Sequence, residues 1–241
     1  MPDFETVLRQ RRSVRAFSQR PVPEEVIEQW LEMARHSPSW SNTQPYKIAL
    51  AQGDVRDALA KELQKKYAAI SPLEKAPLWK KLLLGWWKQA LPNGDFRPIL
   101  NYPEDLQHRR VETGKGLYQT LNISRSDIRA RREQMARNFC FFDAPVVLFL
   151  FSHGKMGAYG ALDSGIFLQS LMLSATHLGL DSCAQGALAL WKSPVEKHFD
   201  IPEPYQLICG LSLGYADPEA PENTYQPAKR QVEELLISRK L

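Results

Sequence analysis

The sequence predicts a single α+β domain that spans residues 1–241. Residues 145–151 are nearly all apolar, as expected of a central strand that is covered on both of its faces. Residues 158–178 form a helix that is apolar almost all round, which places it inside a core or an interface. The chain contains no internal repeat and no low-complexity linker that would divide it into separate domains.

Periodicity and capping residues predict the other elements. A short helix covers residues 3–11, with Asp3 as its N-cap. A second covers residues 23–36, where proline and two glutamates form the first turn and an apolar stripe follows at helical spacing. Ser124 caps a later helix, with Asp127 in its capping box. Further helices are predicted at 54–70, 104–121, 124–138 and 228–237, and strands at 46–51, 206–214 and, with a loop as the alternative, 181–187.

Two stretches are expected to lie outside this core. Residues 71–103 are broken by prolines and carry Trp79, Trp86 and Trp87, which indicate either a buried helix or a mobile cover over an aromatic ligand. Residues 218–226 are predicted to be extended and polar, and the last helix starts with Lys229 and Arg230.

Composition excludes several classes of protein. The chain is 44% hydrophobic and 24% charged, which is ordinary for a globular protein. No apolar run is long enough to span a membrane, and the first residues do not resemble a signal peptide. Three widely spaced cysteines without a CxxC pair indicate a reducing compartment, hence a cytoplasmic location. The five histidines show no zinc spacing, so no metal site is expected. The net charge of +4 fits an anionic ligand or nucleic acid and does not distinguish them.

The most informative stretch is Arg11-Arg12-Ser13-Val14-Arg15. A guanidinium presents a planar fork of donors that suits phosphate, and it stays charged at any working pH. In an extended segment Arg11, Ser13 and Arg15 share one face. That face suits a phosphate at one end and a polar ring edge at the other. For an isolated stretch, a solvated basic patch is the alternative interpretation.

Common catalytic and phosphate-binding motifs are absent. There is no GxGxxG or Walker A loop, so a phosphate would be held by side chains. There is no GxSxG, and nothing in the sequence near Cys183 would lower its pKa and make it a nucleophile. No acid–base pair is evident either, which favours a bound redox cofactor that supplies its own chemistry.

A second stretch, Pro38-Ser39-Trp40-Ser41-Asn42-Thr43-Gln44-Pro45-Tyr46, gives the basic stretch a context. With the long core helix, Gln185-Gly186, Gly214-Tyr215 and a late basic residue, this order of motifs resembles the nitroreductase family of FMN-dependent oxidoreductases. The resemblance implies an antiparallel sheet wrapped by helices in a domain-swapped homodimer. The C-terminal tail would embrace the partner, and residues of about 71–138 would form the variable cover.

The resemblance also implies the cofactor contacts. Arg11, Arg12 and Ser13 would hold the phosphate and ribityl end of FMN. Arg230, with Lys229 as a further candidate, would join them from the far end of the chain. Arg15 would reach the N1/O2 side of the flavin, where a cation stabilises the anionic reduced form.

Three further positions complete the implied flavin contacts. Gln185 and Gly186 match the segment whose backbone N–H faces flavin N5. Gln169 lies on the same face of its helix as Leu162 and Ile166. A buried amide there needs partners, so Gln169 is either a structural hydrogen bonder or a pocket residue that contacts the cofactor.

The loop at 38–44 would complete the site. Pro38 and Ser39 would contact the cofactor of the other subunit, and Asn42 and Gln44 would orient the loop or the ring. Trp40 and Ser41 would line the substrate side, although smaller residues often stand at the position of Trp40 in this family.

The resemblance implies a ping-pong reaction without catalytic side chains. NADPH or NADH passes hydride to flavin N5 and leaves, and a small aromatic acceptor, a nitroaromatic or a quinone, then takes two electrons.

Two other functions compete. A reductive dehalogenase of the iodotyrosine deiodinase type shares RRSVR and Pro-Ser, and would bind an amino-acid zwitterion with a Glu, a Tyr and a Lys, for which Glu104, Tyr118 and Lys115 are available. A nucleic-acid-binding module would use the arginines of residues 129–137. Acids interrupt those arginines and no aromatic platform accompanies them, so we expect a solvated helix face and no nucleic acid.

Overall fold

The computed structural model describes residues 2–71, 91–97 and 101–238, with positions 77, 79, 82, 83 and 99 between them. Trp86 and Trp87 lie outside the described residues, so both interpretations, a buried helix and a cover over an aromatic ligand, stay predictions. The described helices and strands are α1 (Phe4–Gln10), α2 (Glu24–Ala34), β1 (Tyr46–Gln52), α3 (Gly53–Ile70), α5 (Glu104–Thr120), α6 (Ile128–Ala136), β2 (Val146–His153), α7 (Gly157–His177), β3 (Asp181–Gln185), α8 (Ser193–Glu196), β4 (Tyr205–Gly214) and α9 (Val232–Leu235). Short 3₁₀ helices are η1 (Trp40–Asn42), η3 (Arg137–Asp143), η4 (Gly154–Met156), η5 (Gly186–Leu190) and η6 (Pro221–Asn223).

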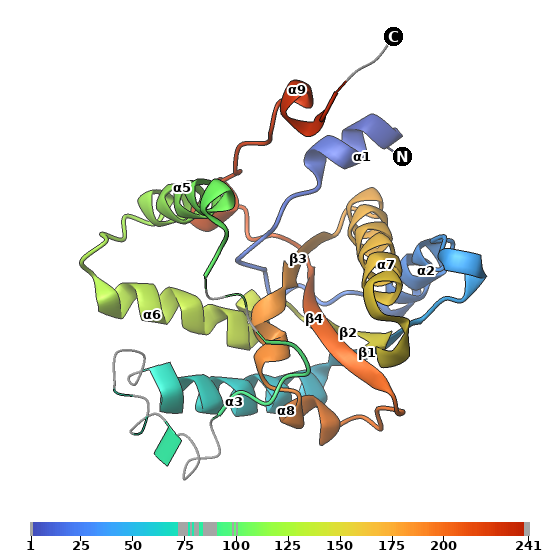
Figure 1. The fold of residues 1–241 in the computed structure, drawn as a ribbon, viewed down its shortest axis with the longest axis horizontal. Coiled ribbons are helices and arrows are strands. Elements are labelled where there is room, and N and C mark those ends of the chain that lie inside the picture. The colour runs from blue at the N-terminus through green and yellow to red at the C-terminus, as the bar shows by residue number, and fades with distance from the viewer. Residues whose placement is uncertain are drawn as a thin grey trace.

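The described strands form one antiparallel sheet in the order β1-β2-β4-β3 (Figure 1). Phe149 pairs with Ala49 of β1 on one side and with Gly210 of β4 on the other. All of β2 except its last residue is buried. The prediction of a central strand covered on both faces is therefore confirmed.

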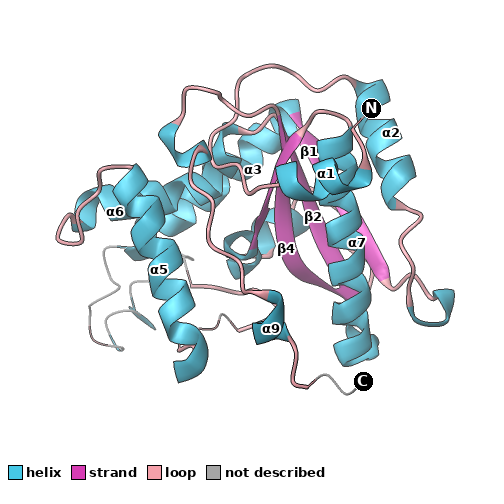
Figure 2. Cartoon of the chain, turned by 90° about the horizontal axis from the view of Figure 1, so that it is seen from above, coloured by secondary structure: helices cyan, strands magenta, loops and turns pink. Residues whose placement is uncertain are grey.

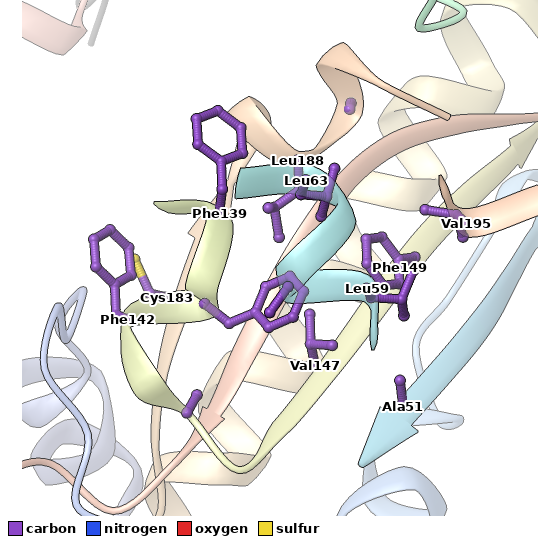
Figure 3. Close-up of a cluster of buried hydrophobic side chains, with 14 of the residues drawn as sticks. Ala51, Leu59, Leu63, Phe139, Phe142, Val147, Phe149, Cys183, Leu188 and Val195 are labelled. Carbon is purple, nitrogen blue, oxygen red and sulfur yellow. The ribbon is translucent and has the colours of Figure 1, made fainter. Parts of the chain in front are cut away.

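Alternate residues of β2 face two different helical layers, as the pleat of a strand requires. Val146, Leu148 and Leu150 belong to the cluster that α2 and α7 cover. Val147 and Phe149 belong to the opposite cluster, whose other members include Leu59 and Leu63 of α3, Phe139 of η3 and Leu188 of η5 (Figure 3). The sheet is thus enclosed between two layers of helices, which is the arrangement that the resemblance implied.

Trp30 fastens α2 to α7. Its side chain is fully buried, and its indole N–H donates a hydrogen bond to the carbonyl of Leu171 at 2.7 Å. The apolar stripe predicted for the second helix therefore faces the core, with Ile27 and Ala34 also buried.

The start of α6 differs from the prediction. The helix begins at Ile128, and its N-cap is Asp127, whose carboxylate accepts a hydrogen bond from the Ala130 N–H at 2.9 Å. Ser124 was wrongly assigned as the cap, because its hydroxyl accepts the Asp127 N–H at 3.2 Å and closes the preceding turn instead. A carboxylate nearer the helix took the position that the hydroxyl was expected to fill.

The tail also differs from its prediction. A helix over 228–237 is wrong, since α9 has only four residues and Lys229 and Arg230 precede it. So short a helix gains little from propensity and needs packing, yet Val232 and Leu235 are exposed in the protomer. Residues 218–226 are not simply extended either, because they contain η6.

α7 is confirmed as a long helix, but only one of its faces lies in the core. Phe167 and Leu171 are buried, whereas Tyr159 and Leu162 are more than half exposed. α5 and α6 stand apart from the sheet on another side of the molecule (Figures 1 and 2), and neither contains a buried residue. Within the described residues, no helix is both long and apolar enough to cross a bilayer.

Candidate functional site

The basic stretch is extended and lies beside β3. Ser13 forms a parallel bridge with Ser182, and the Val14 N–H donates to the Ser182 carbonyl at 3.1 Å. Val14 is fully buried and anchors the segment, while Arg11, Arg12 and Arg15 are half-buried. The extended conformation is therefore as predicted, and it is stabilised by the edge of the sheet.

The arginines of this stretch carry unneutralised charge. Within the described residues, none of Arg11, Arg12 and Arg15 forms an ion pair. The Nε atom of Arg12 is buried without a hydrogen-bond partner. An Nη1 atom of Arg15 donates to the Ser13 carbonyl at 3.3 Å. A buried donor without a partner costs free energy, so these groups suit an anionic ligand with several acceptor oxygens.

Cys183 lies in the field of this stretch but is not activated by it. Burial raises the pKa of its thiol to about 11, although the positive charges of Arg15 and Arg11 act in the opposite direction. The sequence showed no group that would lower this pKa. The structure corrects that view, because two such groups are present and burial outweighs them.

Gln185 and Gly186 stand at the end of β3, where η5 begins. The Gln185 side chain is buried, donates to the Asn138 carbonyl at 3.0 Å and accepts from the Ser212 hydroxyl. This amide is fully used inside the protein, so only the backbone here remains for a ligand. Gly186 is exposed, and a Cβ atom at this position would meet nothing within 4 Å.

The loop at 38–44 is held by its own side chains. The Ser39 hydroxyl accepts from the Gln44 N–H at 2.9 Å, and the Gln44 amide donates to Asn42 Oδ1 at 3.1 Å. Ser41, Asn42 and Gln44 have positive φ angles of 49°, 55° and 46°. Such backbone is strained for residues other than glycine and persists only where the surroundings hold it. Asn42, Gln44 and Ser39 therefore hold one another within the loop, and the roles expected of Asn42 and Gln44 at the cofactor stay predictions.

Asp163 anchors this loop and was missed by the sequence reasoning. Its carboxylate is buried on α7 and accepts the Trp40 N–H at 3.1 and 3.2 Å. An acidic residue on an otherwise apolar helix was the available signal. The indole of Trp40 is 58% exposed and contacts the Tyr159 ring at 4.8 Å between centroids. Pro38 and Ser41 are exposed too, so the loop presents its side chains outward.

Three candidates remain apart from these groups. Gln169 is half-buried, and its amide has no hydrogen bond to any described residue, so a structural role within the protomer is not supported. Lys229 and Arg230 are exposed, and within the described chain neither forms an ion pair or a side-chain hydrogen bond. The nearby α9 is tied to α5, where Arg109 donates to Glu234 at 2.9 Å.

The two competing functions find little support. Glu104 and Lys115 stand on one helix, which separates them by about 16 Å along its axis. No described contact brings their side chains together. The Arg129 side chain is paired with Glu133 at 2.8 Å, as expected of a solvated helix face.

A helix-wrapped antiparallel sheet with a cationic segment beside β3 defines the class of this protein, and comparisons with known proteins agree. The chain matches the Nitroreductase family over residues 8–215. It is 33% identical over 226 residues to the 4-nitrobenzoate reductase of Pseudomonas putida, and this match covers 92% of this chain and 89% of that enzyme. It is 30% identical over 237 residues to the nitrobenzene nitroreductase of Ectopseudomonas oleovorans, with 97% and 95% coverage.

Among solved structures, it resembles the FMN-dependent nitroreductase NfnB from Mycobacterium smegmatis in complex with NADPH. The TM-score is 0.84 at 32% identity, and the match covers 98% of this chain and 97% of that one. This chain therefore belongs to the nitroreductase family and is an oxidoreductase.

Proposed function

We propose that this protein binds FMN and uses NADPH or NADH to reduce nitroaromatic compounds, and quinones as a second acceptor class, by a ping-pong mechanism. The curated relatives named above are reductases of nitroaromatic compounds, and one solved relative is FMN-dependent and contains NADPH. Because these relatives align with nearly the whole of this chain, they support the same substrate class here. We further propose a single domain over residues 1–241 with its cover at about 71–138, and a cytoplasmic location.

The observation that carries this proposal is the set of three arginines beside β3 that form no ion pair with any described acidic residue. FMN has a dianionic phosphate at one end and a polar ring at the other. Arg11, Arg12 and Ser13 are assigned to the phosphate and ribityl end, where the free Nε of Arg12 gains an acceptor. Arg15 is assigned to the N1/O2 side of the ring. Its positive charge there favours the reduced anion over the neutral oxidised ring.

When bound, FMN supplies the two-electron chemistry, which explains why the chain offers no acid–base pair. Gly186 leaves open space at the end of β3, so its backbone N–H can approach a ligand without hindrance from a side chain. Ser39 and Pro38 present the loop of one protomer to the site of the other, and Trp40 forms an aromatic wall for the acceptor. Gln169, whose side-chain amide has no hydrogen bond to any described residue, is assigned to the same shared site.

We propose a domain-swapped homodimer because apolar surface is left uncovered. Trp40, Tyr159 and Leu162 form an exposed apolar area around the N-terminal half of α7, and areas of this kind mark protein interfaces. β1 is an edge of the described sheet, with unpaired backbone groups. An open hollow of about 660 Å³ borders it, lined by residues 47–50, 151, 199–202 and 205.

The tail of a second copy is the proposed occupant of this edge. Val232, Leu235 and Ile237 are exposed apolar residues at the end of the chain, and an extended peptide can pair with a sheet edge. In this arrangement Arg230, with Lys229, is carried across the partner towards an FMN phosphate. The exposed position of both residues in the protomer is consistent with that role.

The first experiment is the absorbance spectrum of the purified protein, where flavin bands are expected. Initial rates with 4-nitrobenzoate as acceptor, at several NADPH concentrations, should give the parallel double-reciprocal lines of a ping-pong reaction. NADH and a benzoquinone are then substituted in turn for donor and acceptor. A colourless protein that gains no flavin from added FMN would refute the proposed function.

Arg230→Ala tests the reach of the tail. A charge-assisted hydrogen bond contributes about 1.5–3 kcal/mol, so the Kd for FMN should rise about tenfold or more. Arg129→Ala removes an arginine whose charge is already paired on the exposed face of α6 and serves as the control. An FMN affinity that Arg230→Ala leaves unchanged would remove this residue from the site.

Sedimentation should give twice the chain mass of 27.5 kDa, and a flavin-loaded monomer would contradict the dimer.

A further inference from the structure

Asn223 of η6 makes an unusual set of contacts with the basic stretch, although 207 residues separate it from Ala16. It is 5% exposed, and its Oδ1 atom accepts from the Arg15 N–H at 2.8 Å and from the Ala16 N–H at 3.2 Å. Its Nδ2 atom donates to the Ala16 carbonyl at 2.8 Å and to the Asp217 carbonyl at 2.9 Å. All the principal hydrogen-bonding positions of one buried amide are therefore used.

This amide replaces a sheet partner at one point of the chain. Before it, the Val14 N–H is bonded to β3. After it, the Phe17 N–H is bonded to the Phe142 carbonyl, and Phe17 forms a bridge with Ala216. Between these two anchors, the backbone N–H groups of Arg15 and Ala16 have the Asn223 oxygen as their acceptor. The Ala16 carbonyl also accepts the Asp217 N–H at 3.0 Å, so Asn223 is the side chain that holds the backbone N–H from which the Arg15 side chain departs.

The preceding residue fixes η6 in turn. Glu222 is 4% exposed, and its carboxylate is paired with Arg137 of η3. A buried carboxylate requires such a partner. Arg137 is followed directly by Asn138, which accepts the Gln185 amide at the end of β3. Two hydrogen-bonded contacts and one ion pair, linked through the peptide bonds Glu222-Asn223 and Arg137-Asn138, therefore connect the backbone of Arg15 to the segment Gln185-Gly186.

We propose that Asn223 is a positioning residue that holds Arg15 against the flavin and so contributes to the reduction potential of the cofactor. Glu222 and Arg137 hold η6 in register with the other flavin-facing segment. This inference rests on the proposed FMN site, in which Arg15 faces the ring. It assigns a function to two buried polar residues of a tail that the sequence alone predicted to be extended and polar.

The test is a redox titration of the FMN-loaded protein in a double-mutant cycle. Arg15→Gln should lower the two-electron potential, because it deletes the cation that favours the reduced flavin. Asn223→Ala should lower it as well, since the Arg15 N–H then loses its acceptor and the stretch between Val14 and Phe17 is held less firmly. We expect a tenfold shift of the oxidised-to-reduced equilibrium, which is about 30 mV for a two-electron couple. In the Arg15→Gln background, Asn223→Ala should add no further shift.

Two further variants keep the test decisive. Asn223→Asp retains an oxygen for both amide groups but turns an anion towards the Ala16 and Asp217 carbonyls, so a smaller shift with the same dependence on Arg15 is expected. Thr176→Val, which removes a side-chain hydrogen bond to Met172 in α7, is the matched control and should leave the potential unchanged. Amide exchange in FMN-free protein should be faster at Arg15 and Ala16 in Asn223→Ala than in Thr176→Val.

The outcomes separate this inference from the function on which it rests. If Arg15→Gln leaves the potential unchanged, the place of Arg15 at the ring is wrong, and this inference is lost with it. If Arg15→Gln lowers the potential but Asn223→Ala does not, or if the two shifts add, this inference alone is overturned. Loss of FMN from both Asn223 variants, while Thr176→Val retains it, would also overturn it, because Asn223 would then serve folding of the tail.

Discussion

The contact between α5 and the tail can be tested by two glycines of the same helix. Gly114 and Gly116 are two positions apart in α5. A Cβ atom at 114 would meet nothing within 4 Å, whereas one at 116 would lie 2.3 Å from Cε2 of Tyr225 and 2.6 Å from its hydroxyl oxygen. Each substitution by alanine gains about 1 kcal/mol of helix propensity, so the difference between the variants isolates the contact with Tyr225.

The expected values follow from this geometry. Gly114→Ala should raise the free energy of unfolding by about 1 kcal/mol, which is roughly 2–4 °C in Tm for a chain of this size. At 116 the ring must be displaced, and overpacking costs about 1–3 kcal/mol in a core; because the ring of Tyr225 is only partly buried, we expect the lower end of that range. Gly116→Ala should therefore be less stable than Gly114→Ala by that amount.

Urea unfolding followed by circular dichroism gives both free energies. A Gly116→Ala protein as stable as Gly114→Ala would show that Tyr225 does not pack on α5. The reasoning about the tail would then fail at this contact. Tyr225→Ala provides the check, because it should remove the difference between the two glycine variants.

Three further predictions concern buried groups. Burial raises the pKa of the Cys183 thiol to about 11, so at pH 8 it should react with iodoacetamide at least a hundredfold more slowly than a free cysteine. Mass spectrometry of the labelled peptide measures this rate, and rapid labelling of the folded protein would contradict the burial of Cys183. Leu171→Ala should lower the free energy of unfolding by about 2–5 kcal/mol, because this side chain of α7 is fully buried against the sheet. Urea titration measures the change, and a loss well under this range would contradict that packing. Asp163→Ala should speed hydrogen exchange of the Trp40 amide tenfold or more, since a hydrogen bond to a charged group contributes about 1.5–3 kcal/mol. Unchanged exchange would mean that another group anchors the loop.

Much of the core was determined by local sequence patterns. The apolar run at 145–151 and the helical stripe around Trp30 could be assigned without tertiary information, because side-chain periodicity alone indicates which face is buried. The order of the two motifs, at 11–15 and 38–46, was sufficient to indicate the family. Both motifs lie within single extended or loop segments, so their residues remain close whatever the rest of the chain does.

The tertiary structure decided everything that depends on partners distant in sequence. In the sequence, Asn223 and Glu222 are only polar residues of a tail predicted to be extended. The fold places them against Arg15 and Arg137, where burial requires each to have a partner. Asp163 is an isolated acid on an apolar helix until the loop at 38–44 brings the Trp40 N–H to it.

The length of the last helix was overestimated, because helix propensity depends on local sequence whereas the stability of a short helix depends on packing against distant residues. Four residues without a packed face cannot extend α9 in the protomer. The sequence by itself therefore determined most of the core helices and strands, though not the ends of α6 or the length of α9, and it indicated which side chains are suited to a phosphate. Only the tertiary structure decided which polar groups are buried and what holds them, because desolvation and hydrogen bonding depend on neighbours that the chain order does not specify.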